Sequence, residues 1–193
     1  MRTSEITRKT NETDITLRLD LDGKGISHID TGVGFFDHML TLLAKHARFD
    51  LEVHVNGDLK VDGHHTIEDI GIVLGQALRE AMGSARGITR YGSIILPMDE
   101  TLVLCAIDIS GRAHLSFDAE LGAEHIGTMD AQLVREFFEA FVRRAELTLH
   151  IRKLAGLNAH HIAECCFKAF ARALSAAVKL DGTDEIPSTK GVL

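Results

Sequence analysis

The sequence predicts an α+β fold in which two similar half-units share one core. The first observation is an internal repeat: His64-His65-Thr66-Ile67-Glu68 recurs 96 residues later as His160-His161-Ile162-Ala163-Glu164. The second is that both halves run in the same order, as a helix, a strand, a connection and a long helix. The third is that no linker separates them. We therefore assign residues 1–90 to the first repeat unit and 91–193 to the second, with its C-terminal tail, within one compact domain.

In the first half, the spacing of the apolar residues predicts the helices and strands. They are extended structure over residues 1–18, a helix over 35–45, a strand over 51–55 and a helix over 65–82. Asp22-Gly23 and Asn56-Gly57 are typical of hairpin turns, so we expect a hairpin at each. Gly71 and Gly75 would weaken an isolated helix, which indicates close approach to a neighbouring element.

The second half predicts more strands before its two helices. The expected strands cover residues 94–96, 102–107, 114–117 and 147–151, and the helices cover 132–144 and 161–179. Residues 181–193 contain turn residues without periodicity, so we expect either an ordered tail or a mobile lid.

Composition excludes several classes of protein. The net charge of −7 argues against a nucleic-acid partner, which usually meets a basic patch. No apolar run approaches the length of a membrane span, and the N-terminus lacks an apolar signal region, so we expect no membrane association. Three cysteines, two of them adjacent, form no disulfide framework, which favours a reducing cytoplasm.

The repeated motif is suited to binding metal ions. His64 and Glu68 share a helix face because residues four apart lie above one another, whereas His65 lies about 100° away. One motif therefore offers a pair of ligands to one ion and a single ligand to another. If the repeats face each other, two sites result, each suited to Mn, Fe, Co, Ni or Zn: one from His64, Glu68 and His161, the other from His160, Glu164 and His65.

Other side chains can complete such sites. His38 begins an earlier helix and can supply a further ligand, and His46 lies eight residues later on the same side of that helix. Lys168 is four residues after Glu164, so it either forms an ion pair or belongs to an anion site beside the metals. In the tail, residues 188–191 (Ser-Thr-Lys-Gly) can close over an anion with hydroxyls, a cation and backbone N–H groups.

The chain resembles the imidazoleglycerol-phosphate dehydratase family over essentially its whole length. The resemblance is carried by Phe36-Asp37-His38-Met39-Leu40, by Asp62-Gly63 with the first motif, by Leu149-His150-Ile151-Arg152, by the second motif with Phe167-Lys168-Ala169-Phe170, and by Pro187-Ser188-Thr189-Lys190-Gly191. It implies two four-stranded sheets with helices packed between them. It also implies a lyase of histidine biosynthesis, with two Mn²⁺ ions per active site, that dehydrates imidazole glycerol phosphate to imidazole acetol phosphate. The implied assembly is a homo-oligomer of 24 subunits with sites between chains.

The resemblance also assigns residues to roles. The implied metal ligands are His64, Glu68 and His161 for one ion, and His38, His65, His160 and Glu164 for the other. Glu136 stands where the family often has a histidine and can complete the first site, because a carboxylate also binds hard divalent ions. The implied phosphate-binding residues are Arg90, Arg112, Lys168, Ser188 and Lys190. Substrate contacts are further expected from Glu12, His38, His46, His64, His65 and Glu68, and the catalytic set is Glu12, His46, Glu68 and Glu164.

The expected chemistry uses the imidazole ring of the substrate as an electron sink, because the proton to be removed is not next to a carbonyl. A metal on a ring nitrogen stabilises an imidazolate. Glu12 is our candidate for proton transfer, with Asp99 and Glu100 as weaker alternatives. Two rival functions are a non-enzymatic metal store and a dinuclear phosphate-ester hydrolase. A store needs no cations beside the metals, and a hydrolase favours more bridging carboxylates than this sequence has.

Overall fold

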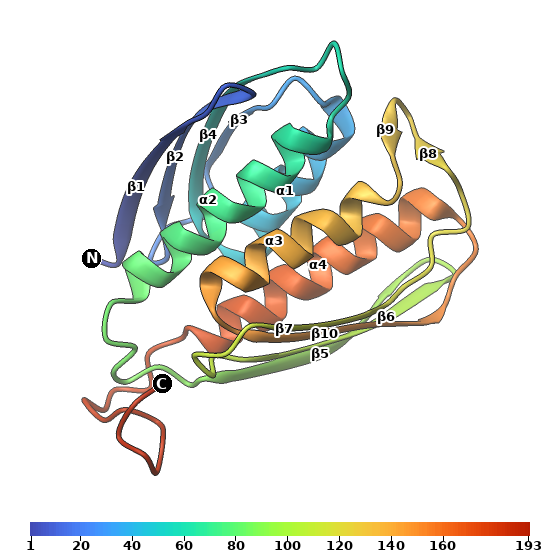
Figure 1. Ribbon diagram of the computed structural model, residues 1–193. Coiled ribbons are helices and arrows are strands. Elements are labelled where there is room, and N and C mark those ends of the chain that lie inside the picture. The colour runs from blue at the N-terminus through green and yellow to red at the C-terminus, as the bar shows by residue number, and fades with distance from the viewer.

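The computed structural model describes residues 1–193 and confirms the α+β fold, with two four-stranded sheets on either side of four helices (Figure 1). The first half contains β1 (Thr3–Lys9), β2 (Thr13–Asp20), β3 (Ser27–Asp30), α1 (Gly34–Ala47), β4 (Asp50–Gly57) and α2 (His64–Met82). The second contains β5 (Tyr91–Met98), β6 (Thr101–Asp108), β7 (His114–Asp118), β8 (His125–Ile126), β9 (Met129–Asp130), α3 (Leu133–Ala145), β10 (Thr148–Ala155) and α4 (Ala159–Ala177).

The two halves repeat one topology. The sheets have the strand orders β1-β2-β4-β3 and β5-β6-β10-β7, and all their pairs are antiparallel except β3 with β4 and β7 with β10. Each parallel pair is joined through a helix, as a parallel connection requires. The helices of the two halves meet in the middle, where α2 packs on α3 and α1 packs on α4.

Both predicted Asp-Gly and Asn-Gly hairpins are wrong. Asp22-Gly23 leads from β2 towards β3, and Asn56-Gly57 ends β4 before the connection to α2. The reason is tertiary: β2 already has β1 and β4 as neighbours, and β4 already has β2 and β3. Neither strand therefore has a free edge for a following hairpin partner. The true hairpin of this half, between β1 and β2, turns inside the stretch 1–18 that we expected to be continuously extended.

The repeat is also less regular than a constant spacing of 96 residues. Leu51 pairs with Leu19, and the corresponding pair in the second sheet is Leu149 with Ile107, so β10 follows β4 by 98 residues, two more than the spacing of the motifs, whereas β6 follows β2 by 88. The shift of two residues keeps every side chain on its face of the sheet, because the strand period is two. The small β8–β9 hairpin, which has no counterpart in the first half, lies between β7 and α3 and was not predicted.

One hydrophobic core of 56 buried residues joins the two halves. In its centre α2 and α3 approach closely at the two glycines singled out in the sequence. A methyl group on Gly71 would lie 2.7 Å from the backbone oxygen of Phe137, and one on Gly75 would lie 2.4 Å from that of Phe141. The predicted close approach is therefore confirmed. No helix combines the length and the apolar character that crossing a bilayer requires.

All four helices begin at the same end of the molecule (Figure 1). A side chain at Gly63, just before α2, would lie within 3.7 Å of both Val33 and Leu133, which stand at the starts of α1 and α3. The ring of Phe35 in α1 lies 5.1 Å from that of His160 in α4. This arrangement places both histidine motifs, which open α2 and α4, at one end.

The C-terminal tail lies at the other end, against the connection between α2 and β5 (Figure 1). Backbone hydrogen bonds join Gly87 to Glu185 and to Asp181, in the connection between α2 and β5. The side chain of Arg90 donates to the backbone oxygen of Pro187 at 2.8 Å. These contacts join residues 181–187 of the tail to the connection that precedes β5.

We predict that Gly75→Ala lowers the stability by about 1–3 kcal/mol, the usual cost of overpacking, because the added methyl group collides with the α3 backbone. Urea denaturation measures the change. Gly34→Ala is the matched control, since a methyl group there meets nothing within 4 Å at the start of α1. Equal losses for both variants would contradict the close-approach role of Gly75.

Candidate metal centre

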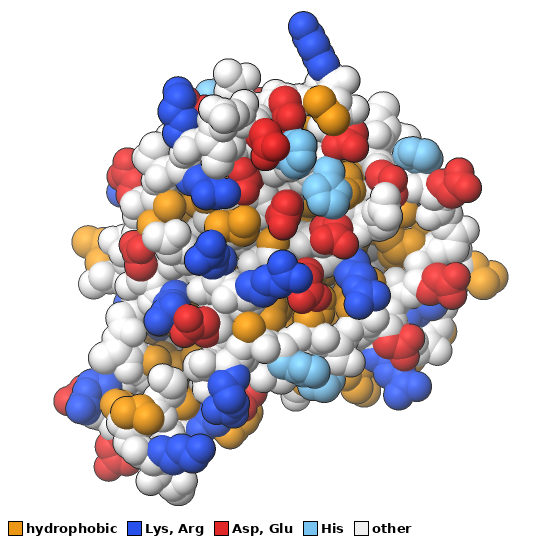
Figure 2. All heavy atoms as spheres, in the orientation of Figure 1, with side chains coloured by type: hydrophobic (Ala, Val, Ile, Leu, Met, Phe, Trp, Pro, Cys, Tyr) orange, Lys and Arg blue, Asp and Glu red, His pale blue; other side chains and the backbone are white.

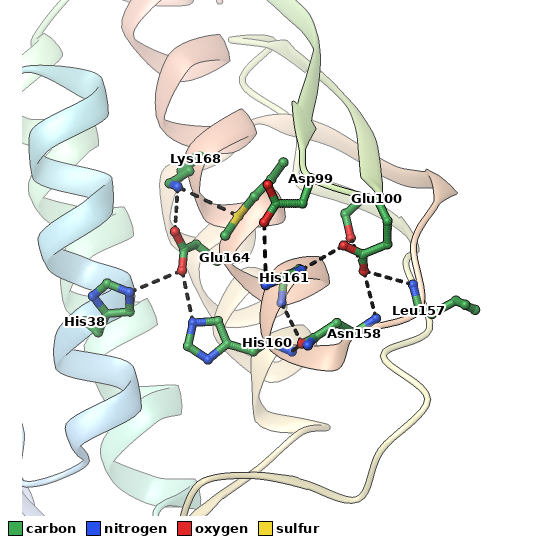
Figure 3. Close-up of polar contacts among 11 residues, drawn as sticks. His38, Asp99, Glu100, Leu157, Asn158, His160, His161, Glu164 and Lys168 are labelled. Atoms are coloured by element: carbon green, nitrogen blue, oxygen red, sulfur yellow. Dashed lines mark hydrogen bonds and ion pairs between the residues drawn. The ribbon is translucent and has the colours of Figure 1, made fainter.

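Three side chains converge at the start of α4. The Nε2 atoms of His38 and His160 lie 3.3 Å and 3.1 Å from the same oxygen, Oε2 of Glu164 (Figure 3). His38 comes from α1 and the other two from the first turns of α4. The three ligand atoms all lie within 4.8 Å of one another, and two imidazoles with a carboxylate form a donor set that suits a divalent transition metal. The residues present therefore fit a metal ion.

Glu164 is held as a charged group despite its burial. Only 7% of the residue is exposed, and Nζ of Lys168 donates to its other oxygen at 2.5 Å. Burial by itself raises the pKa of Glu164, but the hydrogen bonds from Lys168 and His38 outweigh it, so the pKa lies below its usual value. The i,i+4 ion pair expected from Lys168 is therefore present.

The local sequence determines where the second motif begins. Asn158 caps α4, and its side-chain oxygen accepts from the backbone N–H groups of His160 and His161. The cap fixes the first turn, so that His160 and Glu164 lie one turn apart on the same face.

His161 points away from that group and towards the β5–β6 turn (Figure 3). Its Nδ1 lies 2.8 Å from Oε2 of Glu100, and its Nε2 lies 3.9 Å from Oδ2 of Asp99. The hydrogen bond to Glu100 raises the pKa of His161 and lowers the pKa of Glu100 to about 2. Glu100 also accepts from the backbone N–H groups of Leu157 and Asn158.

The first motif has similar surroundings at the start of α2. Nε2 of His64 lies 4.0 Å from Oε2 of Glu68, which confirms that the two share a helix face. Nδ1 of His65 lies 3.0 Å from Oδ2 of Asp58, and its Nε2 lies 3.7 Å from Oε1 of Glu12. The hydrogen bond to Asp58 raises the pKa of His65.

A partly buried network ties the turn that carries Glu12 to this helix. Asp69, in the second turn of α2, accepts from the guanidinium of Arg8 at 2.9 Å and from the hydroxyl of Thr13. Arg8 and Thr13 flank the β1–β2 turn that carries Glu12. Asp69 therefore holds that turn beside the histidines.

A single chain does not unite the two motifs. The group of His38, His160 and Glu164 is the one set of three metal-binding side chains that come within 4.8 Å, and it contains no residue of α2. Neither His161 with the α2 pair nor His65 with the α4 pair forms such a group. Figure 2 shows histidine and acidic side chains gathered on the surface over the start of α2.

Two further predicted residues lie near these groups. Glu136 is half-buried in the first turns of α3, which packs alongside the start of α2, and its carboxylate makes no hydrogen bond or ion pair. His46 lies on α1 beside α4, where burial and then the charge of Lys168 lower its pKa.

Four of the five predicted phosphate-binding residues gather at the opposite end. Ser188 and Lys190 are in the tail, Arg90 donates to Asp108 and to the tail, and Arg112 follows Gly111, against which Leu193 packs. Arg90 precedes β5 and Glu100 follows it, so this strand of eight residues separates them by roughly 26 Å. Lys168 alone lies beside the metal-binding group. Figure 2 shows Lys and Arg side chains, with acidic ones among them, around the tail.

Sequence reasoning missed Asp58 and Asp69, and it missed the hydrogen bond between Glu100 and His161. A signal for Glu100 exists, because Glu12-Thr13 and Glu100-Thr101 recur 88 residues apart, and both threonines are buried at the start of the second strand of a hairpin. The spacing of 96 residues concealed this second correspondence.

Comparison with known proteins gives the family. The family model described as imidazoleglycerol-phosphate dehydratase matches residues 31–174. Proteins of that name from Xanthobacter autotrophicus and Azorhizobium caulinodans are 60% and 61% identical over 195 residues, which cover 100% of this chain and 99% of each relative. The chain belongs to the imidazoleglycerol-phosphate dehydratase family.

Solved structures of imidazoleglycerol-phosphate dehydratases have the same fold. The crystal structure from Staphylococcus aureus matches with a TM-score of 0.84 at 44% identity and covers 92% of this chain and 99% of its own. The Pyrococcus furiosus protein, solved in complex with (S)-C348, matches with a TM-score of 0.85 at 38% identity and covers 97% and 100%.

Membership of the dehydratase family establishes the reaction. The chain is a hydro-lyase that acts on a small molecule, removing water from imidazoleglycerol phosphate in histidine biosynthesis. This confirms the predicted family and enzyme class, and it decides against the metal store and the phosphate-ester hydrolase.

We predict that Glu100→Gln destabilises the metal-free dehydratase most between about pH 4.5 and 6.5. Because folding lowers the pKa of Glu100, its contribution to the free energy of unfolding is complete above 4.5, the pKa of this carboxyl in the unfolded chain. The raised pKa of His161 means that its contribution is complete below its unfolded value of 6.5 and is lost as the pH rises through the folded pKa.

Urea midpoints of wild type and variant from pH 4 to 9 measure this profile. The control is Glu139→Gln, which removes an ion pair with an arginine instead of a histidine, so its stability deficit should lack the fall above pH 6.5 that a histidine partner causes. A flat deficit for Glu100→Gln as well would show that its ion pair with His161 is absent in solution.

Proposed function

We propose that this dehydratase uses two Mn²⁺ ions per active site and forms imidazole acetol phosphate. The observation that carries the proposal is the convergence of His38, His160 and Glu164 on one point within 4.8 Å. In the proposed arrangement His65 completes this set, and His64, Glu68, Glu136 and His161 hold the second ion. When bound, the ions supply Lewis acidity that favours the imidazolate form of the substrate ring.

The chain's own residues then move the protons. Dehydration breaks a C–H and a C–O bond: a base takes the proton from carbon, a protonated group gives a proton to the hydroxyl so that it leaves as water, and the enol tautomerises to the ketone. Glu12 is the proposed base, since its carboxylate is half-exposed and lies 3.7 Å from Nε2 of His65. Glu100 is less suited to this role, because a carboxylate whose pKa is lowered to about 2 is a weak base and its oxygens already accept hydrogen bonds. His46, Glu68 and Glu164 are the other proposed catalytic residues.

The active site is proposed to lie between chains of a homo-oligomer, for which the family resemblance suggests 24 subunits in the cytoplasm. Two features of one chain support sharing. The donors of α2 and α4 do not come together, and Arg90, which binds the tail, lies roughly 26 Å from Glu100 along β5. A second chain that places its first histidine motif beside His38, His160 and Glu164 would complete the metal sites. A tail that reaches both would complete the phosphate site.

We predict that chelation abolishes the formation of the ketone from imidazoleglycerol phosphate and that added Mn²⁺ restores it. Product analysis by NMR measures the reaction, and metal analysis gives the number of ions per chain. Mg²⁺ serves as the control and should restore little ketone formation, because the imidazole-rich donor set favours a transition metal. Full turnover by protein shown to be free of metal would overturn the proposed cofactor.

We predict that two inactive variants recover activity when their chains are mixed. Glu12→Gln damages the α2 side of a shared site and His160→Ala the α4 side, so a mixed oligomer contains some sites with both sides intact. The matched control mixes Glu12→Gln with His64→Ala, which damage the same side and should not recover. Turnover after dissociation and reassembly is the measurement. If neither mixture recovers although both reassemble, the sites are not shared.

A further inference from the structure

Two of the motif histidines share an arrangement that the others lack. The Nδ1 atom of His65 lies 3.0 Å from Asp58, and that of His161 lies 2.8 Å from Glu100. Their Nε2 atoms face a second carboxylate at longer range, Glu12 at 3.7 Å and Asp99 at 3.9 Å. For His38, His64 and His160, by contrast, Nδ1 has no hydrogen-bond partner, and Nε2 faces a motif glutamate.

The contact at Nδ1 decides the chemical form of the ring. An ionised carboxylate only accepts hydrogen bonds, so Nδ1 must carry the proton. The neutral ring then has its lone pair on Nε2, the atom that is free to bind a metal. In the other tautomer Nε2 carries the proton and cannot act as a ligand.

Both backing carboxylates come from outside the helix of their histidine. Glu100 belongs to the β5–β6 turn and is held by the N–H groups of Leu157 and Asn158. Asp58 follows β4, and its backbone N–H donates to the backbone oxygen of Glu12 at 3.0 Å. Each helix therefore supplies the histidine, while a neighbouring segment holds its ring.

We propose that Asp58 and Glu100 are positioning residues, which hold His65 and His161 in the tautomer and orientation that present Nε2 to a ligand. The two residues occupy different places in their halves, because Asp58 follows β4, an inner strand of its sheet, and Glu100 follows β5, an edge strand of the other sheet. The arrangement is therefore not a simple copy of the repeat. The identity of the ligand as a metal ion rests on the proposed function, whereas the tautomer does not.

The tautomer of His161 is measured first, in metal-free protein. Ring ¹⁵N shifts are followed with rising pH until they no longer change, so that the ring is neutral although its pKa is raised, and they then distinguish protonated Nδ1 from protonated Nε2. The signal is assigned by its loss in His161→Asn. We expect protonated Nδ1 in wild type, a mixture of tautomers in Glu100→Ala, and the wild-type form in Glu100→Gln, whose amide oxygen still accepts. Asp58→Ala should likewise give a mixture of tautomers at His65.

Mn²⁺ affinity is measured second, by competition with a fluorescent chelator. Removing such an outer partner typically weakens binding about 10- to 100-fold, which is the loss expected for Glu100→Ala and Asp58→Ala, with partial rescue in Glu100→Gln. Asn158→Ala is the matched control, because it removes the α4 cap without touching the His161 ring. It should lower the melting temperature and leave the tautomer unchanged.

The outcomes separate this inference from the proposed function. Wild-type tautomer and Mn²⁺ affinity in both alanine variants overturn the positioning role, even if the enzyme uses Mn²⁺. A changed tautomer in protein that binds no Mn²⁺ at all supports the positioning role and overturns the proposed cofactor. If Glu100→Ala does not fold, Asp58→Ala carries the same test at the ring of His65.

Discussion

The close packing of α2 against α3 is the contact on which the arrangement of this dehydratase depends. Gly71 and Gly75 let the backbones of the two helices approach without intervening side chains. The two halves thereby share one core, and all four helices begin at the same end of the molecule. The motif at the start of α2 and its copy at the start of α4 consequently lie at the same end of the molecule.

The same geometry limits what one chain can do. Helices and strands that run the length of the molecule carry the histidine motifs at one end and the tail with its cations at the other. The substrate, an imidazole with a short phosphorylated chain, is far shorter than the strand between them. This separation makes oligomerisation part of the proposed catalytic chemistry and gives the mixing of variants its diagnostic value.

At the end of the molecule where the helices begin, carboxylates form hydrogen bonds or ion pairs with the motif histidines. Glu164 remains ionised although buried because Lys168 and the histidines stabilise its charge, and Asp58 and Glu100 each back a histidine ring. Asp69 extends the pattern by tying the Glu12 turn to α2 through Thr13. The donors are thus held in place by contacts between different elements, which is a form of preorganisation.

The sequence by itself determined the fold class, the helices and the pairing of His64 with Glu68 and His160 with Glu164, because apolar periodicity and i,i+4 spacing are local properties of the chain. It also indicated the glycine contact in α2. Tertiary structure alone decided that Asp22-Gly23 and Asn56-Gly57 make no hairpins, since the edges of β2 and β4 are taken. It likewise decided that Asp58 and Glu100 back the histidines. The grouping of His38 with His160 and Glu164 came from the family resemblance and not from spacing within the chain, and the structure brings these three side chains together. These contacts join segments from 7 to 126 residues apart in the chain, and side-chain periodicity carries no information about them.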